Sequence, residues 1–335
     1  MFSESIREMP LRAAVVGCGP VGQIHAETLS AHPMTELVGV CAPSKARRDP
    51  LARRLATRAF PNLNELMDQV ACDVVCIASP DETHWELTRD ALLADKHVLC
   101  EKPLGQAACE AQQLQQMAES RNLALGVTYN RRYGFAYRQA TALLSEGRIG
   151  NLHQCWLQVT DHTPSARVAT RSDIIFWTLL THHFDLIRHL CGDVQSVTAR
   201  IHSSRDDQIV DSVNVILDLR LAGSATLTAA YRDNQSRTTE RCELVGSRGS
   251  IIVDNVTESV QCYGTDPDQV HEYRPNPFLA GNAFYESLKS LIIDFVNCLS
   301  NAQPPTVTAR DAVISMQLAE AALRSHREGS AVAVS

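Results

Sequence analysis

The chain has 335 residues, of which 44% are hydrophobic and 21% charged, and its formal net charge is −7. A chain of this length is expected to form two domains, and this composition argues against extended disorder. Because the acidic balance provides no basic field for a polyanion, we expect no nucleic-acid partner.

The apolar segments are too short for a membrane helix or a secretory leader. No segment approaches the roughly 18–20 uninterrupted apolar residues that a membrane helix needs, and residues 1–12 contain no stretch of signal-peptide length. The 11 cysteines are scattered singly, without a CxxC pair. We therefore expect a cytoplasmic protein with reduced thiols, no metal site and no membrane partner.

The first third of the chain alternates short apolar runs with amphipathic stretches. The runs are rich in Val, Ile, Leu and Cys without polar alternation, which is typical of strands covered on both faces. This alternation predicts an α/β fold with a Rossmann-type, doubly wound parallel sheet in a dinucleotide-binding domain at residues 1–128. The expected strands are 11–17, 36–41, 72–79, 96–100 and 123–127, and the expected helices are 20–31, 45–57, 62–70, 82–94 and 106–120.

The pattern changes after Asn130. Several later segments alternate polar and apolar residues, which is typical of a largely antiparallel, open sheet with one covered face. We therefore predict a second, α+β domain at residues 129–335, which binds substrate and forms oligomers. Its expected strands are 151–161, 194–203, 210–219, 223–231, 240–246 and 250–254, and its expected helices are 135–146, 174–191, 281–300 and 308–327.

A glycine motif, Gly17-Cys18-Gly19-Pro20-Val21-Gly22, follows the first strand and opens the first helix. The first glycine permits a tight turn, the second lets the backbone approach a pyrophosphate, and the third lets helix and strand pack closely. The helix N-terminus then faces the phosphate charge. In this strand–turn–helix context the motif predicts dinucleotide binding, the alternative being a glycine-rich turn without a ligand.

The end of the second strand indicates which dinucleotide binds. A site selective for NAD carries Asp or Glu about 20 residues after the motif, and here that place is Ala42. A hydroxyl and basic residues follow, and such groups bind a 2′-phosphate that a carboxylate would repel. We expect NADP(H), with NAD as the other candidate; a solvated basic helix start is the alternative interpretation. The residues concerned are Ser44, Lys45, Arg47 and Arg48.

Four blocks of the sequence resemble one known family, the Gfo/Idh/MocA oxidoreductases, which include glucose–fructose oxidoreductase and inositol dehydrogenase. The segment 76–105 contains the family's Glu-Lys-Pro signature, and segment 129–152 resembles the start of its second domain. Segment 181–193 is similar to its His-x-x-Asp helix, and segment 244–255 to a late glycine turn. The resemblance covers nearly the whole chain.

The resemblance implies a role for the signature Glu101-Lys102-Pro103. Lys102 would lie beside the nicotinamide and the reacting hydroxyl or carbonyl, where its charge would stabilise an alkoxide or where it would relay the proton. Pro103 would help to turn the chain, with a cis bond as one way to do so. The other residues that the resemblance assigns to the cofactor are Glu101, Ser79, Pro80 and His84.

His182 is the second catalytic residue that the resemblance implies. A neutral imidazole can take the hydroxyl proton as hydride leaves, or return it in the reduction. Thr178, His182 and Asp185 are spaced to lie on one stripe of a helix. Asp185 either orients His182 or bonds to nearby backbone. His183 points about 100° away on the helix, which disfavours chelation by the two histidines.

Two departures from the family pattern concern the substrate. The usual carboxylate position falls on Thr178, which can hydrogen-bond a substrate but cannot act as a base near pH 7. A glycine-rich lead-in is replaced by the bulky segment 172–177, and Leu180 lies near the place of a missing glycine. These changes imply a narrower or more apolar pocket and leave proton transfer to Lys102 and His182. The remaining expected substrate contacts are Asn130, Arg131 and Asp161, whereas Tyr129, Trp156, Trp177 and Tyr231 are expected to be packing residues and not platforms for the substrate.

Together these features predict an enzyme that moves a hydride between NADP(H) and a secondary alcohol or ketone of a sugar, a cyclitol or a sugar-derived metabolite. The substrate is expected in the crevice between the domains, and the open sheet suggests a homodimer or homotetramer. Two alternatives stay open: a dinucleotide-sensing regulator without turnover, and a reductase of an imine or conjugated substrate.

Overall fold

The structure, a computed structural model, describes residues 9–162, 172–203, 210–221, 223–232, 238–256, 258–266, 268–276 and 281–334. The chain forms two compact units, one of Met1–Asn130 with Tyr285–Ile314 and one of Arg131–Phe284 with Ser315–Ser335. The chain therefore returns to the first unit after residue 284. The sequence prediction of one boundary, between residues 128 and 129, does not include this return.

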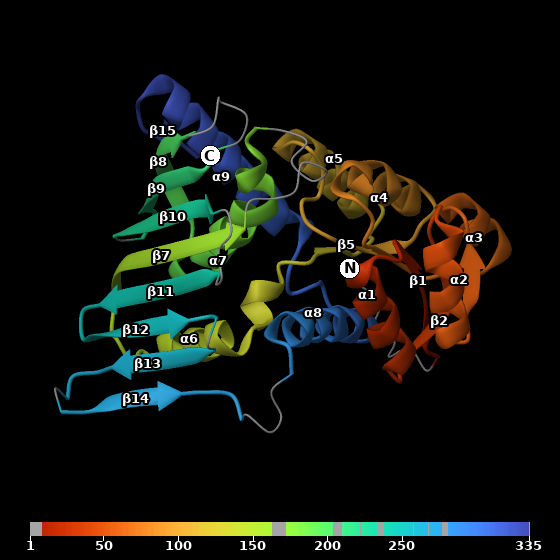
Figure 1. The fold of residues 1–335 in the computed structure, drawn as a ribbon, viewed down its shortest axis with the longest axis horizontal. Helices are drawn as coiled ribbons and strands as arrows, with labels where there is room; N and C mark the ends of the chain where they lie inside the picture. The colour runs from red at the N-terminus through yellow and green to blue at the C-terminus, as the bar shows by residue number, and fades with distance from the viewer. Residues whose placement is uncertain are drawn as a thin grey trace. The chain divides into compact units, whose positions relative to one another are not determined.

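The first unit contains a six-stranded parallel sheet in the order β3-β2-β1-β4-β5-β6 (Figure 1). Each strand up to β5 is joined to the next by a helix, and β4 is buried along its whole length, as expected of a strand covered on both faces. The predicted doubly wound α/β sheet is confirmed. Its strands are β1 (Leu11–Val16), β2 (Thr35–Cys41), β3 (Arg58–Phe60), β4 (Val74–Ile77), β5 (His97–Cys100) and β6 (Leu125–Val127).

The helices of the first unit follow the order that the sequence predicts, with small shifts at their ends. Helix α8, from the returning segment, packs against β6. The Phe295 ring lies so close to Gly126 that a Cβ there would be only 2.8 Å from it. The helices are α1 (Pro20–Ala31), α2 (Lys45–Arg54), α3 (Leu63–Gln69), η1 (Asp81–Thr83), α4 (His84–Leu93), α5 (Ala108–Ser120) and α8 (Ala283–Ser300). The short helix η2 (Asn130–Tyr133) begins at the last residue of this unit and continues into the second.

The second unit contains a nine-stranded sheet in the order β14-β13-β12-β11-β7-β10-β9-β8-β15. All neighbouring strands are antiparallel except β7 and β10. The strands are β7 (Leu152–His162), β8 (Val194–His202), β9 (Ser212–Leu219), β10 (Ser224–Arg232), β11 (Thr239–Gly246), β12 (Gly249–Asp254), β13 (Ser259–Tyr263), β14 (Val270–Tyr273) and β15 (Val332–Ala333).

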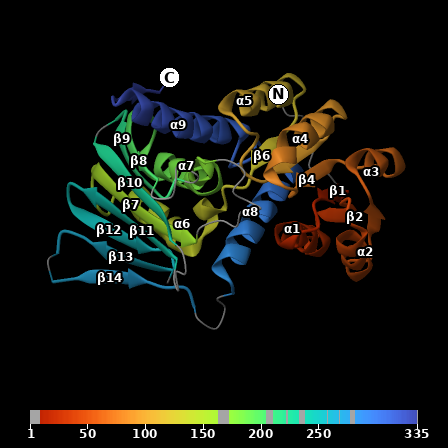
Figure 2. The ribbon, with the colours of Figure 1, turned by 45° about the horizontal axis from the view of Figure 1, so that its top comes forward.

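Helices cover one face of this sheet (Figures 1 and 2). On β9 the residues are buried and exposed in strict alternation, and large apolar side chains such as Trp156 and Ile216 are 42% and 49% exposed on the other face. The predicted sheet with one covered face is therefore confirmed. The helical elements of this unit are α6 (Phe135–Ser145), the π-helical turn η3 (Phe176–Leu180), α7 (Thr181–Cys191) and α9 (Ala309–Glu328).

Some elements differ from the prediction. The helix expected at 174–191 is divided into the π-helical turn η3 and α7. Strands β3, β13, β14 and β15 are not among the predicted strands, because they are short and, in β14, mostly exposed, so they carry little hydrophobic periodicity. Within the part of the chain that the structure describes, no helix is both long and apolar enough to span a membrane.

Candidate active site

The glycine motif forms the turn between β1 and α1. Gly17 has a φ of +106°, and a Cβ there would lie 2.1 Å from the carbonyl oxygen of Ala78 at the end of β4. A Cβ at Gly22 would lie 2.0 Å from the Gly17 oxygen. Both positions therefore require glycine to fold. Gly19 differs from these two glycines. A Cβ at Gly19 would meet none of the described residues within 4 Å, its chain neighbours aside. This face of the turn is therefore open to a ligand.

The start of α1 suits an anion. Gly19 is the N-cap residue, Pro20 begins the helix, no side chain caps the first turn, and the first turn, which includes Val21 and Gly22, contains no acidic residue. The first backbone N–H groups of a helix lack intrahelical partners and carry partial positive charge. The open cradle at Gly19 and these N–H groups together fit the pyrophosphate of a dinucleotide.

The end of β2 presents a small residue and basic side chains. Ala42, where NAD-selective sites carry a carboxylate, is buried. Arg48 donates to the carbonyl oxygens of Ala42 and Pro43, at 3.0 and 2.8 Å, and so holds the turn itself. Ser44 is the N-cap of α2 without a side-chain cap bond, and it and Arg47 are exposed. Three of the four residues, Ser44, Lys45 and Arg47, are thus exposed, whereas Arg48 is engaged with backbone.

The end of β4 is joined to the Glu-Lys-Pro signature by His84. This histidine is fully buried, with Nδ1 2.7 Å from the Pro103 oxygen and Nε2 3.0 Å from the Ser79 oxygen. Both ring nitrogens face backbone oxygens, so His84 fixes the positions of these two turns. Pro80 is exposed beside Ser79, whose hydroxyl lies 2.6 Å from that of Thr83.

Glu101 is held behind Lys102. The Lys102–Pro103 peptide bond is cis, as the sequence suggested, and Lys102 is half-buried. His25 of α1 lies with Nε2 3.1 Å from Oε1 of Glu101. Burial alone would raise the pKa of Glu101, but hydrogen bonds from His25 and Thr128 and the charge of Lys102 hold that pKa below its ordinary value. Glu101 therefore stays ionised, and its bond to His25 fixes the chain immediately before Lys102.

In the second unit, Thr178 lies in η3 and is bonded to Tyr231 at the end of β10. The two hydroxyl oxygens are 2.8 Å apart, and the Thr178 hydroxyl also donates to the Ile174 oxygen at 3.0 Å. Asp161 pairs in register with Tyr231. Burial raises the pKa of Tyr231 to about 12, opposed by its bond to Thr178 and assisted by the negative charge of Asp161. The structure thus brings together Thr178, Asp161 and a tyrosine expected only to pack.

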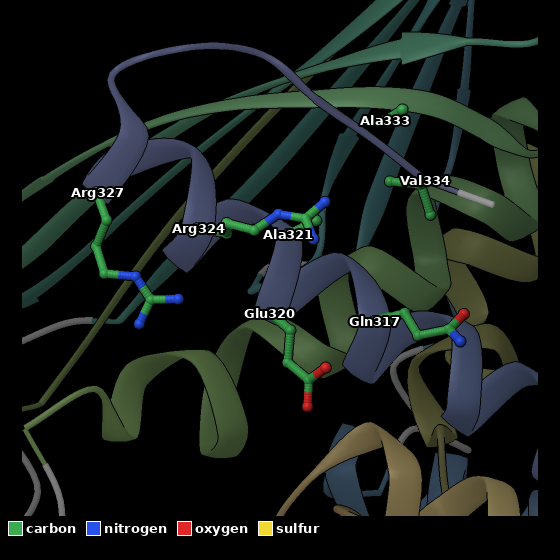
Figure 3. Close-up of a pocket in the computed structure, with 7 residues that line it drawn as sticks. All are labelled: Gln317, Glu320, Ala321, Arg324, Arg327, Ala333 and Val334. Carbon is green, nitrogen blue, oxygen red and sulfur yellow. The ribbon is translucent and has the colours of Figure 1, made fainter.

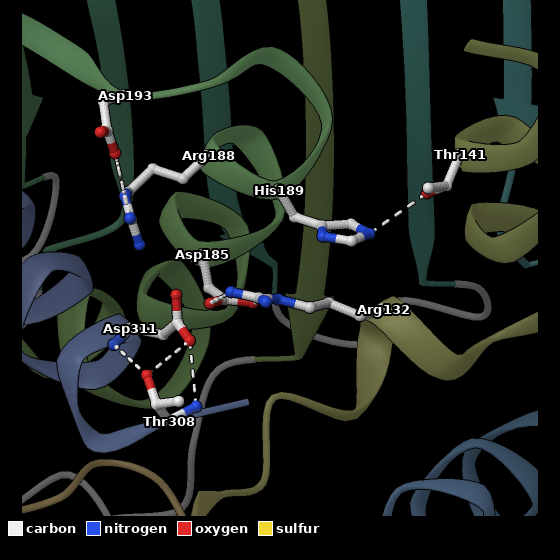
Figure 4. A network of polar contacts seen from close by, with 8 residues as sticks. All are labelled: Arg132, Thr141, Asp185, Arg188, His189, Asp193, Thr308 and Asp311. Carbon is white, nitrogen blue, oxygen red and sulfur yellow. Dashed lines mark hydrogen bonds and ion pairs between the residues drawn. The ribbon is translucent and has the colours of Figure 1, made fainter. Parts of the chain in front are cut away.

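His182 lies half-buried in the first turn of α7. Asp185, one turn later, is buried and accepts two hydrogen bonds from Arg132, whose Nε is 2.8 Å from Oδ2 (Figure 4). Farther along the same helix, Arg188 donates to Asp193. One partner of Asp185 is therefore the Arg132 guanidinium, which neither sequence interpretation named.

The two residues expected to contact substrate just after the last strand of the first unit have internal partners. Asn130 is 6% exposed and donates to the Ser287 hydroxyl of α8 at 2.8 Å. Arg131 forms an ion pair with Glu240 of β11. Neither position displays a side chain without a partner, so a direct substrate contact by either remains only a prediction.

A cavity of about 360 Å³ lies along α9 and the C-terminal strand (Figure 3). Its lining includes Glu320, Arg324 and Arg327. None of the predicted site residues borders it, so the chemistry that the sequence indicates lies elsewhere in the molecule.

Two family models match this chain. One, described as an oxidoreductase family with an NAD-binding Rossmann fold, matches residues 11–129, and the other, the GFO/IDH/MocA C-terminal domain, matches residues 137–252. The chain belongs to the Gfo/Idh/MocA oxidoreductase family. The family consists of NAD(P)-dependent oxidoreductases that act on CH–OH groups, so the protein is an enzyme of this class.

Named relatives match over nearly the whole length. Myo-inositol 2-dehydrogenase of Thermotoga maritima is 27% identical, covering 96% of this chain and 98% of the relative. The scyllo-inositol 2-dehydrogenase (NAD(+)) of Bacillus subtilis is 26% identical, covering 97% and 96%. Among solved structures, a probable dehydrogenase from Thermotoga maritima has a TM-score of 0.84 at 26% identity, covering 96% of this chain and 98% of that one. A levoglucosan dehydrogenase complex with NADH and levoglucosan has a TM-score of 0.88 at 19% identity, covering 97% and 100%, and shares the fold.

Proposed function

We propose that this protein is an NADP(H)-dependent dehydrogenase whose substrate is a secondary alcohol, or the matching ketone, of a sugar, a cyclitol or a sugar-derived metabolite. The observation that carries the proposal is the open cradle at Gly19, set at the N-terminus of α1 in a Rossmann sheet. The full-length similarity to inositol dehydrogenases supports the substrate class. The relatives' names favour turnover over the regulator alternative.

Lys102 and His182 carry the chemistry in this proposal. The nicotinamide ring, when bound, supplies the hydride acceptor or donor at its C4 atom. The charge of Lys102 stabilises the alkoxide that forms as the substrate hydroxyl is deprotonated. His182 takes that proton in the oxidation and returns it in the reduction. Glu101, the residue before Lys102, is held by the bond between its carboxylate and His25.

The choice of NADP(H) over NAD(H) rests on the end of β2. Buried Ala42 offers no carboxylate to the ribose 2′-hydroxyl, and the exposed Ser44 and Arg47 offer a hydroxyl and a guanidinium at the N-terminus of α2. Lys45 adds a second exposed positive charge. A 2′-phosphate bound there gains charge-assisted hydrogen bonds, whereas an unphosphorylated ribose gains few.

Substrate recognition is assigned to the second unit. Thr178, Tyr231 and Asp161 place two hydroxyls and a carboxylate near the first turn of α7, which carries His182. Such groups donate to and accept from the hydroxyls of a polyol. We further propose a cytoplasmic homodimer or homotetramer that associates through the uncovered face of the nine-stranded sheet, with no nucleic-acid or membrane partner.

The experiment that tests this function begins with calorimetric titration of the purified protein with NADPH and with NADH. We expect tighter binding of NADPH, and loss of at least part of this preference in Arg47→Ala. Cyclitols and sugars are then screened with NADP⁺ for absorbance at the reduced nicotinamide band. Lys102→Ala is expected to lower kcat by about 100-fold or more with little change in nucleotide affinity.

Each outcome bears on one part of the proposal. A preference for NADH would overturn the assignment of Ser44 and Arg47 and leave the dehydrogenase in place. Binding of neither nucleotide would overturn the function and favour the regulator. Unchanged turnover in Lys102→Ala would remove the catalytic role of Lys102.

A further inference from the structure

Glu240 is a buried carboxylate in β11 that belongs to none of the family motifs. Only 5% of the surface of Glu240 is exposed. An ionised carboxylate taken out of water is strongly destabilising unless charged or hydrogen-bonding partners compensate it. A side chain of this kind therefore persists only with a dense set of partners, which the structure provides.

The partners come from three helical elements, η2, α6 and α7, and from the turn after β12. Oε1 accepts hydrogen bonds from the Tyr137 hydroxyl at 2.9 Å and from Nδ2 of Asn255 at 3.0 Å. Oε2 is ion-paired with Arg131 and lies 3.2 Å from Nε2 of His183. Burial would raise the pKa of Glu240, but Arg131, His183 and Tyr137 together lower that pKa to about 2. The carboxylate is therefore ionised and fixed in position from both oxygens.

His183 connects this carboxylate to the start of α7. It is fully buried, its Nδ1 lies 2.9 Å from the Leu179 oxygen, and its Nε2 faces Glu240. Each ring nitrogen of His183 therefore has a partner, one in the backbone of α7's lead-in turn and one in the Glu240 side chain. Leu179 belongs to the π-helical turn η3, and single π turns are frequent at functional sites. The imidazole thus joins the backbone of η3 to Glu240.

The residue immediately before His183 is His182. Successive side chains on a helix are about 100° apart, so fixing the ring of His183 fixes the direction in which the His182 side chain leaves the helix. We propose that Glu240, acting through His183, is a positioning residue that orients the His182 imidazole for proton transfer. This inference rests on the proposed catalytic role of His182.

The test compares Glu240→Gln with wild type. The amide keeps the size of the side chain but removes the charge that holds His183 and Arg131. We expect kcat to fall about 10- to 100-fold, because small displacements of a catalytic group have effects of this size, while the KM for the nucleotide stays within about twofold. The substrate used is myo-inositol, or the polyol with the highest rate in the screen above.

Further variants isolate the contact. His183→Gln leaves the Arg131–Glu240 ion pair intact and is expected to reproduce the loss of kcat, and the double variant should be no worse than the more affected single one. Hydrogen exchange of the amides at 181–184 should be faster in Glu240→Gln than in wild type. Glu146→Gln, at the exposed end of α6, serves as the control and should behave as wild type.

The outcomes separate the two proposals. If His182→Ala is inactive while Glu240→Gln and His183→Gln keep the wild-type kcat, the positioning role is overturned and the proposed function stands. If His182→Ala turns over as wild type does, the catalytic assignment of His182 fails. If Glu240→Gln does not fold, His183→Gln provides the decisive kcat and exchange measurements.

Discussion

At the scale of single residues, the glycines of the β1–α1 turn have two different roles: some are required by the fold, and one leaves space for a ligand. Gly17 and Gly22 are required by the chain, since a Cβ at either would overlap backbone atoms at about 2 Å. Gly19 has an ordinary φ of −76° and open space beside it. A glycine that the fold does not need, at the N-terminus of a helix, indicates that a bound group occupies the space instead.

This difference predicts that Gly19→Ala weakens nucleotide binding and leaves the fold intact. We expect the free energy of unfolding to change by less than about 1 kcal/mol, because the added methyl group clashes with none of the described residues. The Kd for NADPH, measured by calorimetry, should rise at least about tenfold. Gly17→Ala is the contrasting variant and should lower the melting temperature strongly, since alanine is strained at a φ of +106°. Unchanged nucleotide affinity in Gly19→Ala would contradict the assignment of the cradle.

The candidate site was predictable where its residues are neighbours in sequence. The glycine motif and Glu101-Lys102-Pro103 are local patterns, and the structure places each at the end of a parallel strand. Glu240 and Tyr231 were not predictable as functional residues, because their partners His183 and Thr178 lie 57 and 53 positions away. Only the fold brings these side chains together. The sequence shows a polar residue at each of these two strand positions, but it does not show the partner.

At the scale of elements, hydrophobic periodicity predicted the long helices and strands well. Helix α1 covers the predicted residues, and α8 and α9 differ from the prediction by one or two residues at their ends. The π-helical turn η3 was not predicted, because its apolar residues fit an α-helical period equally well. What holds η3 against α7 is polar: the hydroxyls of Thr178 and Thr181 donate to carbonyl oxygens four residues earlier, and His183 bonds to Leu179.

The clamp on α7, formed by Glu240 and His183, predicts a pH dependence of stability. The pKa of Glu240 lies near 2 in the folded protein instead of 4.5, a difference worth about 3 kcal/mol. Above about pH 4.5 this stabilisation is complete, since the carboxylate is ionised in both states. As the pH falls from about 4.5 towards 2, the unfolded chain takes up a proton that the folded protein does not, so the free energy of unfolding decreases.

Urea unfolding measures this contribution. At about pH 7 the Glu240→Gln variant should be less stable than wild type, because Arg131 loses its counter-ion. Between about pH 7 and pH 3 the difference between the two proteins should shrink by about 2 kcal/mol. A difference that stays constant over this range would show that Glu240 does not titrate as the buried ion pair requires. Glu146→Gln again serves as the exposed control.

At the scale of the whole molecule, the uncovered face of the nine-stranded sheet carries apolar side chains. Trp156 of β7 and Ile216 of β9 both lie opposite Thr226 of β10, so the three form a row across neighbouring strands. Both large residues are more than two-fifths exposed. Large apolar side chains exposed on an uncovered sheet face are a common feature of interfaces between subunits.

If this face joins copies of the chain, a charge placed in its centre should separate them. We expect wild type to be a dimer or tetramer at micromolar concentration by light scattering coupled to size exclusion, and Ile216→Asp to shift the protein towards monomer. The reason is that a carboxylate buried in an apolar interface without a partner costs several kcal/mol, which exceeds the margin of many interfaces of standard size. Leu93→Asp, which changes an equally exposed apolar residue of α4, should leave the assembly unchanged.

A monomeric wild type, or an Ile216→Asp variant that assembles normally, would show that the row on β7, β10 and β9 is not the interface. Loss of turnover together with assembly in Ile216→Asp would further indicate that the sheet transmits assembly to Asp161 and Tyr231, which lie near the ends of two of these same strands.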